Sequence, residues 1–201
     1  GMWMHSMITL SSVLVSVLIC FVIGVPLGII ASYNKWYRDI QNVVLDAMQT
    51  LPYFCYLIPV LMFFGGNIVS AVIATVIYAV PPIIRLTALG LSQVSGSYSE
   101  VSRSFGGTGI QTLNKVKFPL AVPSLVMGFN QTVIMAFAMQ IVTPLIGGKG
   151  LGLQVFNALQ RSDTGRGLSA GLAIVLLAII IDRISHAWTK KQRIALGLDK
   201  S

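Results

Sequence analysis

Long apolar stretches alternate with short polar segments along most of this chain. A helix needs roughly 20 apolar residues to cross a hydrocarbon core about 30 Å thick. Five stretches are long enough, and they cover residues 7–31, 43–64, 68–91, 120–146 and 168–188. The pattern therefore predicts an all-α, polytopic membrane protein with about five transmembrane helices.

Composition and charge agree with this prediction. Of the 201 residues, 55% are hydrophobic and only 10% are charged, whereas soluble domains carry about 25% charged residues. The net charge of +8 could indicate binding to nucleic acid. The basic residues, however, lie beside the apolar stretches and form no continuous basic face. We therefore expect membrane lipid around the chain and no nucleic-acid partner.

The basic residues cluster in three segments, which follow the first, third and fifth stretches. They are Lys35 and Arg38, then Arg103, Lys115 and Lys117, then Lys190, Lys191, Arg193 and Lys200. Cytoplasmic loops are enriched in Lys and Arg. We therefore expect these segments to be cytoplasmic, with the N-terminus outside and the C-terminus in the cytoplasm. Residues 1–6 hold neither a basic leader nor a cleavage site, so we expect a single domain over 1–201 that lacks upstream spans.

Two connecting segments are longer than the others. Residues 92–118 are rich in Ser, Gly and charge, and they form the predicted cytoplasmic segment. Residues 147–167 are rich in Gly and are predicted to form a loop outside the cytoplasm. Within that loop, the apolar residues of 151–160 are spaced as in a short interfacial helix.

Helix-breaking residues interrupt several stretches. They are Gly24, Pro26 and Gly28 in the first, Pro52 and Pro59 in the second, Pro81 and Pro82 in the third, and Pro123 and Pro144 in the fourth. Membrane helices tolerate such residues where neighbours satisfy the freed backbone groups. They are expected to be ordinary kinks, or else pivots for alternating access.

A spaced motif lies in the predicted cytoplasmic segment. Glu100-Val101-Ser102 is followed after three residues by Gly106, and after nine more by Val116-Lys117-Phe118-Pro119. This resembles the signature of ABC-importer permeases, Glu-Ala-Ala, three residues, Gly, nine residues, Ile, any residue, Leu-Pro. The spacing is kept throughout, while Val and Ser replace the two alanines, and Val and Phe replace Ile and Leu.

The residues of this motif can form a short amphipathic helix. Over residues 98–105, Val101 and Phe105 share one face, Glu100 lies near the start, and Gly106 with Gly107 ends the helix. In the family, this coupling helix docks in a cleft of the ATP-binding subunit. The resemblance implies that Glu100, Val101, Ser102, Phe105, Gly106, Phe118 and Pro119 couple this chain to the ATPase.

The resemblance extends over nearly the whole chain and points to the glycine betaine/proline branch of type I importers. It rests on residues 46–52, 81–87, 130–132 and 180–183. It implies a prokaryotic plasma membrane, a second permease subunit, a substrate-binding protein outside and a dimer of ATP-binding subunits that hold ATP and Mg. No phosphate-binding Gly-x4-Gly-Lys-Ser/Thr loop occurs in this sequence, so we expect no catalytic site, cofactor or metal here. The alternatives are a permease for an amino acid such as methionine and an ion-coupled secondary transporter.

Polar and aromatic residues inside the stretches offer further candidates. Asn130, Gln131, Gln140 and Thr143 either line the solute path or hydrogen-bond between helices. Charges inside a membrane are costly, so the charged residues near the cytoplasmic span ends are expected to lie at interfacial depth or to pair, with Asp46 or Asp182 as candidate partners of Arg85. These residues are Asp46, Arg85, Asp182 and Arg183. The rings of Tyr53, Phe54, Tyr56 and Tyr78 could cage a quaternary ammonium group, although packing is the expected role.

Overall fold

The structure, a computed structural model, describes the backbone of residues 2–195 and the side chains of residues 2–187. It is all-α, with no strand among the described residues, as the sequence predicts. The helices are α1 (Met2–Tyr33), α2 (Lys35–Thr50), α3 (Phe54–Phe64), α4 (Ile68–Ala79), α5 (Pro81–Gln93), α6 (Gly96–Ser104), α7 (Gly109–Thr112), α8 (Phe118–Met139), α9 (Leu151–Gln160) and α10 (Thr164–Ala195), with a π-helix η1 (Leu113–Lys117) and a 3-10 helix η2 (Thr143–Ile146). The side chains of Lys190, Lys191 and Arg193, and all of Lys200, lie outside the described residues.

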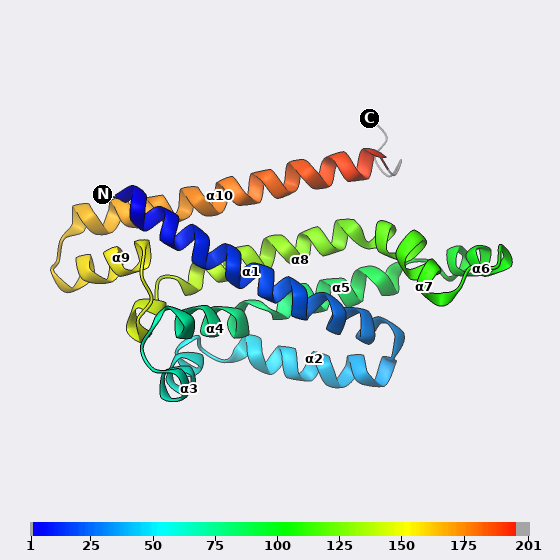
Figure 1. The fold of residues 1–201 in the computed structure, drawn as a ribbon, viewed down its shortest axis with the longest axis horizontal. Coiled ribbons are helices and arrows are strands. Elements are labelled where there is room, and N and C mark those ends of the chain that lie inside the picture. The colour runs from blue at the N-terminus through cyan, green and yellow to red at the C-terminus, as the bar shows by residue number, and fades with distance from the viewer. Residues whose placement is uncertain (1, 196–201) are drawn as a thin grey trace.

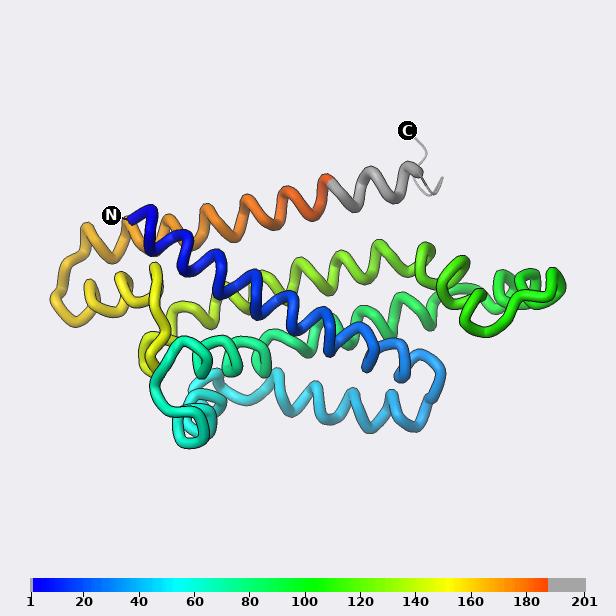
Figure 2. Tube along the Cα trace, in the orientation of Figure 1, coloured from blue at the N-terminus to red at the C-terminus, as the bar shows by residue number. Residues whose placement is uncertain are grey.

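The chain forms an elongated bundle (Figure 1), which it crosses five times if the bent pair of α2 and α3 is taken as one crossing. Helix α1 runs from the end that carries the N-terminus to the opposite end, and α2 returns. Helices α4 and α5 then run in the same direction as α1, α8 returns, and α10 makes the last crossing (Figure 2). The α1–α2 turn and α6 therefore lie at one end of the bundle, while the N-terminus, α3 and α9 lie at the other. The core is formed mainly where α1, α5 and α8 pack together.

Three of the predicted spans are found as expected. The first and fifth correspond to α1 and α10, and the third corresponds to α4 and α5 together. Helix α5 begins with Pro81 and Pro82, which suit a first helical turn because its N–H groups have no partner within the helix. This pair therefore marks a break inside one span.

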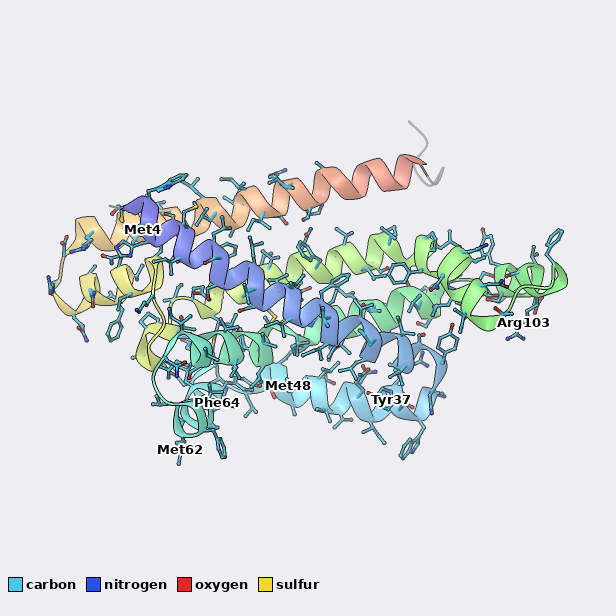
Figure 3. All side chains as sticks on the ribbon, in the orientation of Figure 1. Met4, Tyr37, Met48, Met62, Phe64 and Arg103 are labelled. Carbon is cyan, nitrogen blue, oxygen red and sulfur yellow. The ribbon has the colours of Figure 1, made fainter. Side chains whose placement is uncertain are left out.

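The second predicted span is corrected by the structure. Residues 43–64 do not form one helix: α2 begins earlier, at Lys35, and the chain bends by 95° between α2 and α3. The residue before a proline is biased away from helical geometry. Leu51, which precedes Pro52, accordingly has ψ 132°. Met62 lies at the outer edge of α3, which crosses the end of the bundle (Figure 3).

The fourth predicted span is also corrected at its outer end. Helix α8 stops at Met139, and residues 140–146 form turns and η2. The chain then reverses at Gly147, whose φ is +91°. A side chain there would also meet the backbone of Gly66 and Asn67 at 2.6 Å. A glycine is needed at this point for both reasons.

Gly24 and Gly28 do not break α1, which is continuous to Tyr33. They lie one turn apart on the face that contacts α5. A Cβ atom at Gly28 would lie 2.6 Å from the Cβ of Thr87, and one at Gly24 would lie 2.5 Å from Ile83. Small residues four apart let two membrane helices approach closely. These glycines therefore set the α1–α5 crossing.

Helix α9 has the bounds that the sequence predicts, and it docks on the beginning of α1. The Thr9 hydroxyl accepts a hydrogen bond of 2.8 Å from the Leu151 backbone N–H, and Gln154 Nε2 lies 3.1 Å from His5 Nε2. Leu151, Gln154 and Ala158 are buried. These contacts join the Gly-rich loop to the end of the bundle that carries the N-terminus.

Candidate functional site

The signature motif begins on α6, which projects from one end of the bundle. This helix covers residues 96–104, so it starts two residues before the predicted segment. Glu100 lies in its middle, which corrects the expectation that it lies near the start. Arg103 lies at the tip of the molecule (Figure 3). The helix rests mainly on η1 and α7 and is therefore open to a partner.

A Schellman motif ends α6 at Gly106. The Gly107 N–H donates to the Ser102 carbonyl (2.9 Å) and the Gly106 N–H donates to the Arg103 carbonyl (2.8 Å). Gly106 has φ +78°, in the left-handed region that this motif requires. The glycine of the motif thus fixes the direction in which the chain leaves α6.

The apolar residues of α6 are exposed. The side chain of Phe105 is 87% exposed, and Val101 and Tyr98 are exposed with it. Together with Gln111, Lys115 and several neighbours they line a groove of about 610 Å³. A group of exposed apolar side chains at the end of a molecule is typical of an interaction surface.

The rest of the motif connects α6 to the bundle. The hydroxyls of Ser102 and Thr112 are 2.8 Å apart, and Thr108 forms a reciprocal capping box with Gln111. The chain then passes through η1, where Lys117 lies 5.0 Å from the centre of the Tyr33 ring of α1. Phe118 and Pro119 begin α8. These contacts connect α6 to α8 through a short segment.

A second polar group lies between α2 and α5. Arg85 Nη2 donates to Asp46 Oδ1 at 2.6 Å. Of the two contacts considered for Arg85, the structure forms this one. Asp182 instead lies 3.5 Å from His186 on its own helix. The pair lines a groove of about 420 Å³ whose other residues are Arg38, Asn42, Ala88, Leu89 and Ser92.

Sequence reasoning missed this groove because it placed the second span at residues 43–64. With the helix beginning at Lys35, polar residues recur every three or four positions, which is the period of one helical face. Counting this period of polar residues from Lys35 would have predicted a polar face on α2.

The candidate path residues of α8 and of the turn after it do not share one exposed face. Asn130, Gln140 and Thr143 are buried within the chain, and only Gln131 is exposed. Asn130 accepts a hydrogen bond from the Ser185 hydroxyl of α10, and Thr143 donates to the Gln140 carbonyl at 3.2 Å. Three of the four candidate path residues thus line no surface of this chain. For Asn130, the alternative of a hydrogen bond between helices is the one formed.

The aromatic residues around the α2–α3 bend pack against one another. Tyr78 makes edge contacts with Tyr53 and Tyr56, with ring centres 6.5 and 6.1 Å apart. The Tyr56 hydroxyl donates to the Met48 carbonyl near the end of α2. These contacts fit the packing role expected from the sequence.

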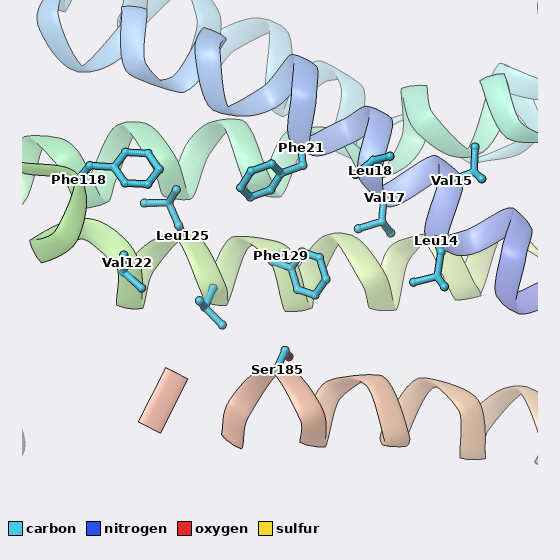
Figure 4. Close-up of a pocket in the computed structure, with 11 residues that line it drawn as sticks. Leu14, Val15, Val17, Leu18, Phe21, Phe118, Val122, Leu125, Phe129 and Ser185 are labelled. Atoms are coloured by element: carbon cyan, nitrogen blue, oxygen red, sulfur yellow. The ribbon is translucent and has the colours of Figure 1, made fainter. Parts of the chain in front are cut away.

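A wide groove between α1, α8 and α10 is almost entirely apolar (Figure 4). It measures about 580 Å³ and is lined by Leu14, Val15, Val17, Leu18, Phe21, Phe118, Val122, Leu125, Val126, Phe129 and Ser185. The one polar side chain in this lining is Ser185, whose hydroxyl is bonded to Asn130. An apolar lining suits hydrocarbon and offers a polar solute no partner.

The fold and the site define a class: a multi-pass α-helical membrane subunit that presents an amphipathic helix at one end of its bundle. Comparison with known proteins identifies the family within this class. A family model described as binding-protein-dependent transport system inner membrane component matches residues 24–194. The chain therefore belongs to this family of transport permeases.

Relatives of this chain include permeases named for glycine betaine. It is 44% identical over 92% of its length to the glycine betaine transport system permease protein OpuAB of Bacillus subtilis (strain 168), covering 66% of that protein. It is 46% identical over 95% of its length to the glycine betaine/carnitine transport permease protein GbuB of Listeria monocytogenes serotype 1/2a (strain 10403S), covering 68%. It is 45% identical over 96% of its length to the glycine betaine/proline betaine transport system permease protein ProW of Escherichia coli (strain K12), covering 54%.

The solved structures confirm the predicted fold. A chain of the MetNI methionine ABC transporter in an inward-facing conformation superposes with a TM-score of 0.80 at 23% identity. The match covers 96% of this chain and 94% of that chain. The fold is therefore that of type I ABC-importer permeases.

Proposed function

We propose that this chain is a membrane-spanning subunit of an ATP-driven importer and forms part of the translocation path for a compatible solute such as glycine betaine or proline betaine. The solute class rests on the glycine betaine relatives, which are 44 to 46% identical to this chain. The likeness to the methionine transporter is one of fold, at 23% identity. The main support for coupling to an ATP-binding subunit is the exposed apolar face of α6, a helix that ends in the turn at Gly106.

In this proposal, α6 docks on a separate ATP-binding subunit that holds ATP and Mg. Val101 and Phe105 enter a groove of that subunit, and Glu100 and Ser102 lie on the same short helix. Closure of the two ATP-binding subunits displaces α6, and the segment from Gly106 to Pro119 passes the displacement to α8. A second permease subunit completes the path, and a substrate-binding protein delivers the solute at the opposite end.

The proposed orientation places α6 and the α1–α2 turn in the cytoplasm. The described basic residues favour it by five to three: Lys35, Arg38, Arg103, Lys115 and Lys117 lie at that end of the bundle, whereas Lys149, Arg161 and Arg166 lie at the other. An excess of Lys and Arg is characteristic of cytoplasmic loops.

The test is uptake of radiolabelled glycine betaine into vesicles that contain the reassembled complex. Uptake should require ATP, and unlabelled proline betaine should compete while methionine should not. Uptake driven by a sodium or proton gradient without ATP would contradict the proposal, and competition by methionine alone would contradict the solute class.

A further inference from the structure

One face of α2 is polar from end to end. Lys35, Asp39, Asn42, Asp46 and Gln49 recur at intervals of three and four residues, so they form a single stripe along the helix. The opposite, apolar side includes Ile40, Val44 and Ala47, which are exposed in this chain. Helix α2 is thus amphipathic, although it crosses the same bundle as the apolar α1.

With Lys35 at the cytoplasmic surface, as in the proposed orientation, the stripe runs toward the middle of the membrane. Asp46 lies eleven residues after Lys35, which is about 16 Å along a helix at 1.5 Å per residue. That distance is about half of a 30 Å hydrocarbon core. Helix α2 runs back from its turn with α1 (Figure 1) and meets α5 at the Asp46–Arg85 pair, so this pair lies well away from the cytoplasmic start of α2.

Lipid does not suit this face. A charged side chain at the centre of a spanning helix costs about 2.5 to 3.5 kcal/mol on insertion scales. The side chains of Asp46 and Arg85 are 63% and 37% exposed in this chain, and the buried Arg85 Nε has no hydrogen-bond partner among the described residues. Intramembrane charges normally face a water-filled cavity or a polar partner.

We infer that the groove between α2 and α5 is the wall of the hydrated passage in its cytoplasmic half, with the Arg85–Asp46 pair in that wall. This inference rests on the proposed function, because the permease must enclose a polar path. It moves the path from the buried polar residues of α8 and the turn after it to an open groove whose polar lining is Arg38, Asn42, Asp46, Arg85 and Ser92. A second copy of the chain closes the passage from the other side.

Cysteine labelling in inside-out membrane vesicles tests the position of water. The background carries Cys20→Ala and Cys55→Ser. Because only the hydrated thiolate reacts, Asn42→Cys and Leu89→Cys, which line the groove, should react with a charged methanethiosulfonate at least about tenfold faster than Val44→Cys and Ala47→Cys. Exposure in the single chain does not favour this result, since Val44 is more exposed than Asn42. Equal rates inside and outside the groove, or no reaction at Asn42→Cys and Leu89→Cys, would overturn the inference. The labelling needs no transport, so it can fail or succeed independently of the proposed function.

Replacing the ion pair by apolar residues tests whether the pair lines the passage or only stabilises the fold. A structural pair can often be replaced by apolar residues of similar size without loss of stability. The double variant Asp46→Leu/Arg85→Met should therefore keep the melting temperature of the detergent-solubilised complex. Its ATP-driven uptake should nevertheless fall at least about tenfold, because the groove loses its charged lining. Unchanged uptake by a folded double variant would overturn the assignment of the pair to the passage.

Discussion

Single glycines at two positions carry much of the local geometry. Position 106 requires glycine only because of its positive φ, since no atom lies within 4 Å of the place where a Cβ would be. Position 152 requires glycine because of lack of space. Its φ is ordinary, but a Cβ there would lie 1.8 Å from the Gln140 carbonyl oxygen. The two residues therefore predict different kinds of damage.

Replacement of Gly106 should uncouple transport. Gly106→Val should reduce ATP-coupled uptake at least about tenfold, because β-branched residues are strained at positive φ. Gly106→Asn should retain most activity, since Asn tolerates the left-handed region. Gly109→Ala is the matched control, with open space and no positive φ. Uptake and the amount of inserted protein are measured together, and normal uptake by the Gly106→Val variant would refute the role of the turn.

Replacement of Gly152 should destabilise the fold. Gly152→Ala should lower the free energy of unfolding by about 1 to 3 kcal/mol or more, because α9 must move away from the end of α8. Gly171→Ala has no atom within 4 Å of its Cβ and should be neutral or stabilising, by up to about 1 kcal/mol, inside a helix. Thermal unfolding in detergent compares the two. Equal melting temperatures would show that the α8–α9 contact is not tight.

At the scale of the element, the two amphipathic helices α6 and α9 differ in what they contact. Helix α9 buries Leu151, Gln154 and Ala158 against the bundle, whereas α6 has no buried residue. The apolar side chains of α6 therefore add little to the folding of this chain. We expect a partner subunit to bury these side chains.

The variant Val101→Ser/Phe105→Ser should weaken binding of the ATP-binding subunit without unfolding the permease. Exposed side chains contribute little to the stability of the chain, while apolar anchors at an interface are typically worth about 2 kcal/mol or more, which is roughly 30-fold in affinity. Leu159→Ser is the control, because Leu159 is 72% exposed at the opposite end. Co-purification with the ATP-binding subunit provides the measurement. Undiminished co-purification of the double variant would exclude α6 as the docking element.

At the scale of the whole molecule, the odd number of crossings places the two ends of the described chain at opposite ends of the bundle (Figure 1). The loop between α9 and α10 and the tip of α6 are also at opposite ends. With α6 in the cytoplasm, the α9–α10 loop must be outside. The orientation of the molecule can therefore be read from a single pair of positions.

Labelling of intact cells tests this orientation. In a background without Cys20 and Cys55, Arg161→Cys should react with a membrane-impermeant maleimide, because the side chain is exposed on the outer loop. Ser104→Cys, exposed on α6, should react only after the cells are opened. The reverse pattern would invert the proposed orientation.

The sequence by itself determined the helical class, four of the five crossings at least in part, the position of α6 and α9, and the glycine turn after α6. These features follow from local chemistry, because apolar length, helical period and left-handed glycine are written in neighbouring residues. Only the tertiary structure decided which polar residues are open. Gln140 is buried because α9 packs over it, and Arg85 meets Asp46 across 39 positions because α2 crosses beside α5. The bend after α2 depends on both the local sequence and the tertiary structure. Pro52 breaks the helix locally, but the angle of 95° between α2 and α3 is set by packing of α3 against α4 and η2.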